Sequence, residues 1–232
     1  MFKALSRLLG SNSKRTIPLR ERDCHSHVLP GIDDGSRNLE ESLAMLRLLR
    51  EAGARTVVAT SHIYPGRFPN EPDELRRKFD ELEEARARHG IDVTLELGAE
   101  HWLDDSLVPR IRAGRVVAFG PERYVLFETT TDFHAPSQLL PTVKTLRDAG
   151  YTPLMAHVER YAYLRDDEGK ELALDLRALG VKFQVNRTVG KANAPGIGAR
   201  GKFLEWLLDH DFVDEVGSDL HRPTPEGRPY TM

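Results

Sequence analysis

The sequence predicts an α/β fold, and within that class a distorted (β/α)7 TIM-like barrel formed by a single domain. Short apolar or β-branched segments alternate with amphipathic helical segments along the chain, a pattern typical of parallel strands joined by helical crossovers. Six of the seven expected strands end at, or just before, a His, Asp or Glu residue. Active sites form at the carboxyl ends of the strands in such barrels, so these polar residues favour a barrel over an open doubly wound sheet.

The spacing of hydrophobic residues indicates where each element lies. Strands are expected at residues 22–25, 56–60, 93–97, 124–127, 152–156, 181–185 and 212–217. Helices are expected at residues 39–52, 74–89, 137–148, 171–179 and 202–210. Ser36 is a candidate N-cap of the first helix, and Gly53 marks its end. The first strand is not followed by Gly-x-Gly-x-x-Gly, so a dinucleotide-binding sheet is not supported. The glycine-rich residues 186–201 are expected to form a mobile loop near the site.

The composition indicates one soluble domain. The chain has 232 residues, of which 40% are hydrophobic and 30% are charged, so it can bury a substantial core. No linker-like segment divides residues 21–232, which we expect to form the domain after an N-terminal arm at residues 1–20. The arm is too short and too interrupted in its apolar content for a signal peptide or for stable membrane insertion. Docking of residues 2–9 on a membrane surface or a partner is the alternative.

Charge and cysteine content exclude other classes of protein. The net charge is −3, and Arg and Glu are interleaved along the expected helices, whereas nucleic-acid binders usually carry a basic excess or stripe. Cys24 is the single cysteine, so a disulfide within the chain is impossible and a reducing, cytoplasmic location is expected. A cysteine-dependent phosphatase needs an arginine six positions after its thiolate, where this chain has Pro30. Cys24 is therefore expected to be a small buried residue.

The polar residues at the strand ends have the chemistry of metal ligands. His25 and His27 are two residues apart on a strand, so both imidazoles can face one ion. Later strand ends and the turn after the first strand supply further donors: Asp34, His62, Glu100, Glu128, His157, Asp219 and His221. Imidazoles and carboxylates without a set of thiolates suit Zn, Mn or Fe. Nine donors are too many for one ion, so we expect two or three ions that share bridging carboxylates, as in enzymes that hydrolyse phosphate esters.

These segments resemble the PHP (polymerase and histidinol phosphatase) superfamily, and within it the bacterial capsule-type protein-tyrosine phosphatases. Six segments carry the resemblance in order: HSHVLPGIDDG (25–35), TSH (60–62), GAE (98–100), LFE (126–128), HVER (157–160) and GSDLH (217–221). Together they extend over residues 22–221, most of the chain. Val158 stands where the family usually has proline, and Ser61 likewise replaces a proline. Neither change removes a candidate ligand.

The resemblance implies the fold, the ligands and the reaction. It implies a distorted (β/α)7 barrel with a trinuclear site, for which Mn²⁺ is the expected metal and Fe or Zn the alternatives. The nine residues above would be the ligands, and Arg160 would contact the phosphate. Arg222 and Arg228 are both candidates for a second phosphate-binding arginine. The implied substrate is phosphotyrosine on a bacterial tyrosine autokinase that controls capsular or exopolysaccharide synthesis. An oligomer of this chain is compatible with the resemblance.

Further roles and other functions stay open at this level. Asp33 is a candidate proton donor. The residues that follow the fourth strand either line the mouth of the site or form a solvated loop: Thr129, Thr130, Asp132, Phe133 and His134. The same site could act on a small phosphate ester such as histidinol phosphate. An amidohydrolase-type barrel also begins with His-x-His, but that class often has a carboxylated lysine where this chain has Glu128. The non-enzymatic alternative is a metal-binding regulator or scaffold.

Overall fold

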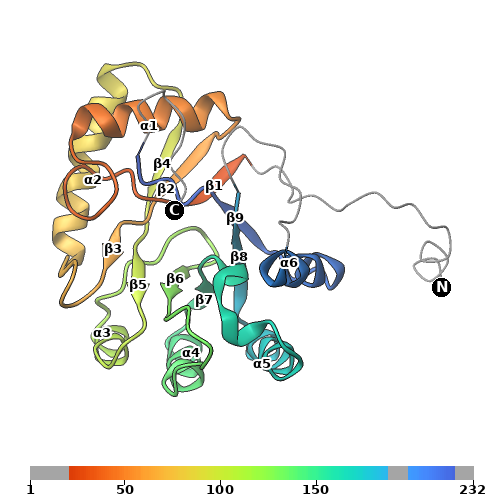
Figure 1. Cartoon of the computed structure of the whole chain (residues 1–232). Helices are drawn as coiled ribbons and strands as arrows, with labels where there is room; N and C mark the ends of the chain where they lie inside the picture. The colour runs from red at the N-terminus through yellow and green to blue at the C-terminus, as the bar shows by residue number, and fades with distance from the viewer. Residues whose placement is uncertain (1–20, 188–197, 223–232) are drawn as a thin grey trace, which may run out of the picture.

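Parallel strands form the inside of the molecule, and helices pack around them (Figure 1). The computed structural model describes residues 21–187 and 198–222. One sheet has the order β1-β2-β4, and a second has the order β3-β5-β6-β7-β8-β9. The strands are β1 (Arg22–Ser26), β2 (Thr56–Ala59), β3 (His62–Ile63), β4 (Thr94–Leu97), β5 (Glu100–Trp102), β6 (Tyr124–Glu128), β7 (Thr152–Met155), β8 (Lys182–Asn186) and β9 (Glu215–Gly217).

The two sheets are joined where β2 leads into β3 and β4 leads into β5. The Gly98 amide donates to the Ala59 carbonyl at 2.9 Å, and the Glu100 amide donates to the Thr60 carbonyl at 3.0 Å, so the pairing continues across the break. Gly98 is required here, because a Cβ at this position would lie 2.6 Å from the Phe119 ring. The short strands β3 and β5 that follow the break carry two of the candidate ligands at their first residues.

The last strand segment lies beside the first. The His27 amide donates to the Leu220 carbonyl at 2.9 Å, and the Asp219 amide donates to the His25 carbonyl at 2.8 Å. Gly217 permits this close approach, because a Cβ there would lie 2.4 Å from the Cβ of His25. The curved parallel strands thus bring the two ends of the described structure together beneath the candidate ligands.

Six helices and two short 3-10 turns cover the strands in the described residues. They are α1 (Leu39–Glu51), α2 (Pro72–Arg88), α3 (Leu107–Arg112), α4 (Leu139–Asp148), η1 (Val158–Arg160), η2 (Ala162–Leu164), α5 (Asp167–Ala178) and α6 (Ala199–Asp209). Asn38 caps α1, because its side chain accepts from the Glu41 amide. The proposed cap Ser36 instead hydrogen-bonds to the Asn38 carbonyl and to Ser42. Within residues 21–187 and 198–222, no helix has both the length and the apolar character needed to span a bilayer.

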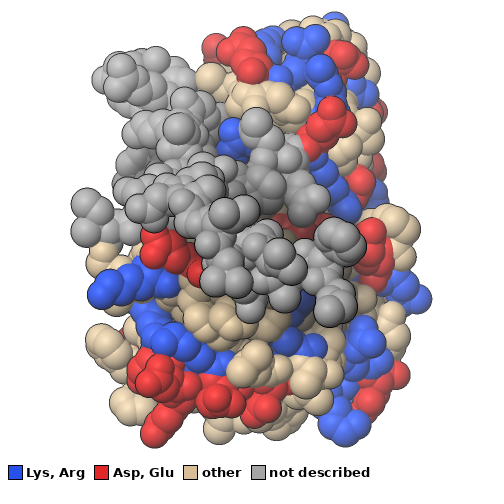
Figure 2. Space-filling view, turned by 90° about the vertical axis from the view of Figure 1, so that its right-hand side faces the viewer, with Lys and Arg blue, Asp and Glu red and all other residues tan. Residues whose placement is uncertain are grey.

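The α/β prediction is confirmed, whereas seven regular strand–helix repeats are not. Each of the seven expected strands overlaps an observed one, and the structure adds β3 and β5 and splits the pairing between two sheets. Residues 1–20, most of the glycine-rich segment (188–197) and Arg228 lie outside the described residues. On the face shown in Figure 2, basic and acidic side chains are interspersed, as the sequence indicated.

The space between the strands is filled by side chains. Residues that face one another across the interior form a buried cluster: Cys24, Val58, Phe119, Tyr124, Leu126, Leu154 and Ala156. Two larger clusters lie between the strands and the helices. A filled interior is typical of small parallel barrels. The polar residues at the strand ends therefore lie next to a closely packed apolar cluster.

The buried His101 is expected to make the stability of the fold depend on pH. Burial lowers the pKa of His101 to about 4, and its Nδ1 lies 3.0 Å from the Leu126 carbonyl, to which it donates. The unfolded chain binds this proton near pH 6.5, so stability falls as the pH drops from 6.5 toward 4. His101→Asn should remove about 1.4 kcal/mol of the loss between pH 7.5 and 5.5. Urea unfolding of the metal-free proteins at both pH values measures this, and equal losses in variant and wild type would contradict it.

Candidate metal centre

Glu100 lies at the middle of the polar residues gathered at the strand ends. Its Oε2 atom is 3.2 Å from His25 Nε2 and 3.4 Å from His27 Nε2. The same oxygen is 3.2 Å from His62 Nδ1, and Oε1 is 3.0 Å from His157 Nε2. One fully buried carboxylate therefore contacts imidazoles from four separate positions along the chain.

The remaining candidate ligands surround this centre. Asp34 Oδ1 lies 3.5 Å from His62 Nε2 and 3.4 Å from His221 Nε2. Asp219 Oδ1 lies 3.4 Å from His25 Nε2. Glu128 Oε1 lies 3.2 Å from His62 Nδ1. All nine residues proposed from the sequence thus belong to one connected cluster.

The donor atoms form three overlapping groups, each compact enough for one ion. The groups are His27, Asp34, His62 and His221; His25, His27 and Glu100; and His62, Glu100 and Glu128. Within a group the ligand atoms lie within 4.8 Å of one another. His27, His62 and Glu100 are each shared by two groups, an arrangement that suits neighbouring ions with shared ligands.

Buried atoms without a hydrogen-bond partner test whether divalent ions fit this site. Asp34 Oδ1, His62 Nδ1 and His221 Nε2 are buried and make no hydrogen bond within the described part of the chain. Buried polar atoms are ordinarily paired, and each of these atoms belongs to a side chain of the three donor groups. The residues present therefore fit divalent metal ions.

Hydrogen bonds behind the site direct two imidazole lone pairs into it. Gln184 Oε1 accepts from the His157 amide at 2.7 Å and lies 3.0 Å from His25 Nδ1, so Nδ1 must donate to it. His27 Nδ1 likewise donates to Asp33 Oδ2, at 2.9 Å. The two Nε2 atoms then face each other at 3.2 Å. Two lone pairs at this distance repel, so the arrangement requires a proton or a metal cation at the centre.

Neighbouring charges within the cluster shift the pKa values of its histidines and carboxylates before any ion binds. Burial opposes a charge on His62, but the nearby carboxylates, Glu100 first, outweigh burial and raise the pKa of His62 to about 10. Burial also opposes ionisation of Glu100, yet the surrounding imidazoles, led by His25 and His62, hold its pKa well below its usual range. A binding cation must therefore displace protons from histidines, as expected for metal sites built on imidazole.

Asp33 is placed to orient His27. Besides His27 Nδ1, its carboxylate accepts from the His62 amide at 3.0 Å and from the Gly35 amide at 2.9 Å. Burial raises its pKa, but these partners, His27 first, lower it to about 2. A carboxylate that is ionised and already accepts three hydrogen bonds favours a positioning role over the proton-donor role considered from the sequence.

The two described phosphate-binding candidates lie in different surroundings. Arg160 Nη1 donates to Asp219 Oδ2 at 3.0 Å, and its side chain lines the cavity above the cluster. Arg222 Nη2 donates to the Asp34 carbonyl at 2.9 Å, so it supports the Asp34 turn, and it does not line the cavity. Arg67 does line the cavity, and it lies 3.4 Å from Asp34 Oδ2.

A cavity of about 260 Å³ opens directly above the cluster. Its lining residues are Asp34, His62, Tyr64, Arg67, Glu100, Trp102, Glu128, Thr129, Thr130, Thr131, His157, Arg160, Asp219 and His221. Of the five loop residues considered from the sequence, Thr129 and Thr130 thus line the cavity, whereas Asp132, Phe133 and His134 are exposed and do not. Tyr64, Arg67 and Trp102 were missed by sequence reasoning, although Tyr64 and Trp102 each lie two residues beyond a candidate ligand.

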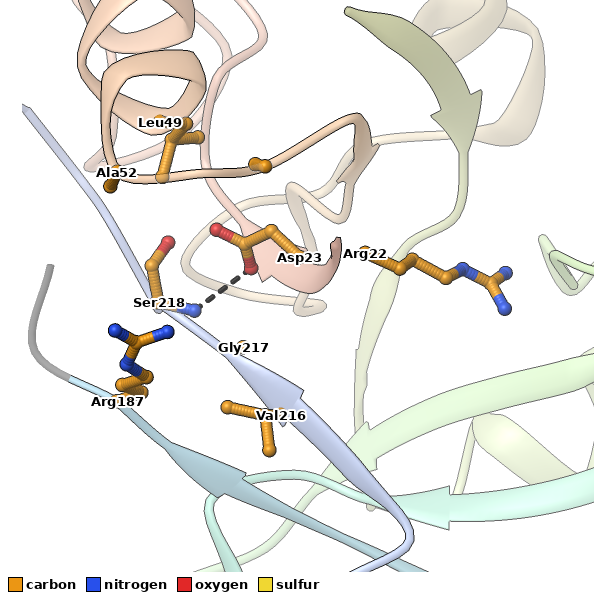
Figure 3. Close-up of a pocket in the computed structure, with 9 residues that line it drawn as sticks. Arg22, Asp23, Leu49, Ala52, Arg187, Val216, Gly217 and Ser218 are labelled. Atoms are coloured by element: carbon orange, nitrogen blue, oxygen red, sulfur yellow. Dashed lines mark hydrogen bonds between the residues drawn. The ribbon is translucent and has the colours of Figure 1, made fainter. Parts of the chain in front are cut away.

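A smaller hollow of about 40 Å³ has a structural role. It is lined by residues in or next to β1, α1, β8 and β9, among them Asp23 and Ser218 (Figure 3). The Asp23 carboxylate accepts from the Ser218 amide at 2.8 Å and from the His25 amide at 3.2 Å. These two bonds hold the backbone at His25 and at Ser218, next to the candidate ligand Asp219.

Gln184 is expected to control the affinity for divalent ions. It anchors His157, whose backbone is held at a φ of 31°, and fixes the tautomer of His25. Gln184→Leu should weaken Mn²⁺ binding by about 10- to 100-fold, whereas Gln184→Glu keeps the acceptor and should lose less. Chelator competition measures the affinity, with the exposed Gln138→Leu as the matched control. Wild-type affinity in Gln184→Leu would contradict this role.

The chain is similar to known proteins over most of its length. Residues 22–230 match the family described as "Capsular polysaccharide synthesis, CpsB/CapC". The chain is 28% identical over 204 residues to the tyrosine-protein phosphatase CpsB of Streptococcus pneumoniae. That alignment covers 86% of this chain and 82% of the relative. It is 29% identical over 203 residues to the tyrosine-protein phosphatase YwqE of Bacillus subtilis (strain 168), covering 86% of this chain and 76% of the relative.

A solved structure gives the same result in three dimensions. It comes from crystal structures of YwqE from Bacillus subtilis and CpsB from Streptococcus pneumoniae, described as "unique metal-dependent tyrosine phosphatases". The TM-score is 0.76 at 26% sequence identity, and the match covers 90% of this chain and 82% of the other. Since the family match extends over most of the chain and includes all nine candidate ligands, the chain belongs to the CpsB/CapC family of capsular polysaccharide synthesis.

Proposed function

We propose that this protein is a metal-dependent protein-tyrosine phosphatase, a phosphoric monoester hydrolase. The convergence of nine imidazole and carboxylate side chains beneath a cavity that Arg160 also lines is the observation that carries the proposal. The relatives named as tyrosine-protein phosphatases support the choice of substrate.

Two or three divalent ions would be held by the seven residues of the donor groups, His25, His27, Asp34, His62, Glu100, Glu128 and His221, together with the adjoining His157 and Asp219. When bound, such ions lower the pKa of water and neutralise charge that develops on a phosphoryl group. The ligand chemistry suits Mn²⁺, with Fe or Zn as alternatives. Gln184 and Asp33 hold His25 and His27 with their Nε2 lone pairs turned inward.

Arg160 supplies the contact to the phosphate. Its guanidinium lies beside Asp219 at the cavity wall, where it can present paired N–H groups to two phosphate oxygens. The phenol of tyrosine has a pKa of about 10, so the leaving group departs as a phenolate with little help from a proton donor. The ionised Asp33 is therefore not needed for that step.

The wider setting follows from the family. We propose a closed (β/α)7 barrel over residues 21–232, supported by the parallel bridge between Ser26 and Leu220 and by the filled interior. We also propose that the protein acts in the cytoplasm on a bacterial tyrosine kinase that controls capsular or exopolysaccharide synthesis. The family's link with capsular polysaccharide synthesis supports this.

The test is a phosphatase assay that a chelator abolishes and added metal restores, combined with elemental analysis of the purified protein. Phosphotyrosine peptide and histidinol phosphate are assayed in parallel. Release of phosphate mainly from the peptide supports the proposal, and release mainly from histidinol phosphate replaces its substrate. A metal-loaded protein that binds the peptide without releasing phosphate would be a regulator.

Cys24→Ala separates this chemistry from the cysteine-dependent kind. Cys24 is fully buried in the interior cluster, and burial raises the pKa of its thiol well above the usual value. Such a thiol is not a nucleophile, so the variant should keep activity within about twofold of wild type when it is folded. A folded, metal-loaded Cys24→Ala protein without activity would overturn the metal-dependent assignment.

A further inference from the structure

Two stacked aromatic rings form one wall of the cavity. The ring centroids of Tyr64 and Trp102 are 4.4 Å apart, and the ring planes differ by 7°. Both side chains are half-buried and line the cavity together with Glu128 and Arg160. Apart from the histidines, they are the aromatic residues in a lining that is otherwise made of charged and hydroxyl side chains. The two rings therefore give this polar cavity an aromatic surface that a ligand can contact.

The strand register explains why the two rings meet beside the metal ligands. His62 of β3 is paired with Glu100 of β5. Trp102 is two residues after Glu100 in β5, and residues two apart on a strand point to the same side. Tyr64 is two residues after His62, just past the end of β3. Trp102 is in turn paired with Glu128 of β6. The aromatic wall is therefore one step outward from the donor cluster.

A small hairpin holds Tyr64 in position. The Tyr64 amide donates to the Phe68 carbonyl at 2.9 Å, and the Phe68 amide donates back at 2.7 Å. The Phe68 ring stacks on the His62 ring with centroids 5.3 Å apart. Asn70 Nδ2 donates to the His62 carbonyl at 2.9 Å. The wall is thus built on the same backbone that positions a ligand, which makes its distance to the cluster fixed.

We propose that the Tyr64–Trp102 pair contacts the ring of the substrate and makes this site select aryl over alkyl phosphate monoesters. The inference rests on the proposed phosphatase function and names the residues that set its specificity. Aromatic rings bind one another through offset or edge contacts. A cavity of about 150 Å³ holds a benzene ring, so about 260 Å³ accommodates a ring and its phosphoryl group. Serine and threonine phosphates lack the ring and gain nothing from the wall.

The experiment compares ligands that differ only in the ring. Inhibition constants for phenylphosphonate and methylphosphonate are measured with the metal-loaded full chain of the wild type, Trp102→Leu and Trp102→Phe. We expect Trp102→Leu to weaken phenylphosphonate about tenfold and methylphosphonate less than about twofold. Trp102→Phe should restore most of the difference. Phe133→Leu is the matched control, because Phe133 is 82% exposed and does not line the cavity.

Catalysis is measured alongside binding. The value of kcat/KM for a phosphotyrosine peptide should fall in Trp102→Leu by about the same factor as phenylphosphonate binding. Equal weakening of both phosphonates, or of neither, in a variant that retains its ions would overturn the role of the wall. A wild type that binds both phosphonates but hydrolyses no phosphate ester would instead refute the phosphatase function.

Discussion

Glu100→Gln is expected to empty the metal site and to lower phosphatase activity by about a thousandfold or more. Glu100 contacts His25, His27, His62 and His157 at 3.0 to 3.4 Å. It belongs to two of the three donor groups. An amide would not supply the negative charge that Glu100 would offer to the ions of both groups, so both groups would lose affinity together.

The loss is measured by elemental analysis after dialysis against Mn²⁺ and by the shift in Tm that added Mn²⁺ produces. Wild type should be stabilised by binding, because ions that bind only the folded state raise its stability, and Glu100→Gln should not be. Glu96→Gln is the matched control, since Glu96 pairs with Arg22 at 2.6 Å away from the cluster. A Glu100→Gln protein with a full complement of ions would refute the proposed ligand set.

The candidate donors could be named from the sequence because strand ends are visible in it. An apolar strand such as β6 has no packing reason to end in Glu128, and His25 in β1 lies two residues before His27, just past the end of that strand. Once strands run in parallel, their ends must meet at the same rim. All nine candidate donors could therefore be named before their distances were known.

The positioning residues could not be predicted in this way. Gln184 lies inside β8, where a single amide gives no signal, and its role depends on reaching both His25 and the His157 backbone. The strands β3 and β5 are only two and three residues long, too short for periodicity to reveal them. The aromatic wall depends on their register, so Tyr64 and Trp102 were missed for the same reason.

Arg160→Lys should lower kcat/KM for a phosphotyrosine peptide by about 100- to 1,000-fold and leave the bound ions in place. Lysine keeps the charge, but as a single point it cannot contact Asp219 and two phosphate oxygens together. The ions should remain, because Arg160 contacts Asp219 Oδ2 at 3.0 Å, whereas Oδ1 faces His25 and His27.

Elemental analysis and the inhibition constant of inorganic phosphate separate the two effects of Arg160→Lys. Phosphate should bind at least about tenfold more weakly at unchanged metal content. Arg86→Lys, which alters a pair with Glu83 on α2, controls for the substitution itself. Loss of the ions together with activity would instead make Arg160 a support for Asp219.

Arg222 supports the Asp34 turn from outside the cavity. Arg222→Lys should therefore lower the ion content before it weakens phosphate binding. The opposite result would make Arg222 the second phosphate contact.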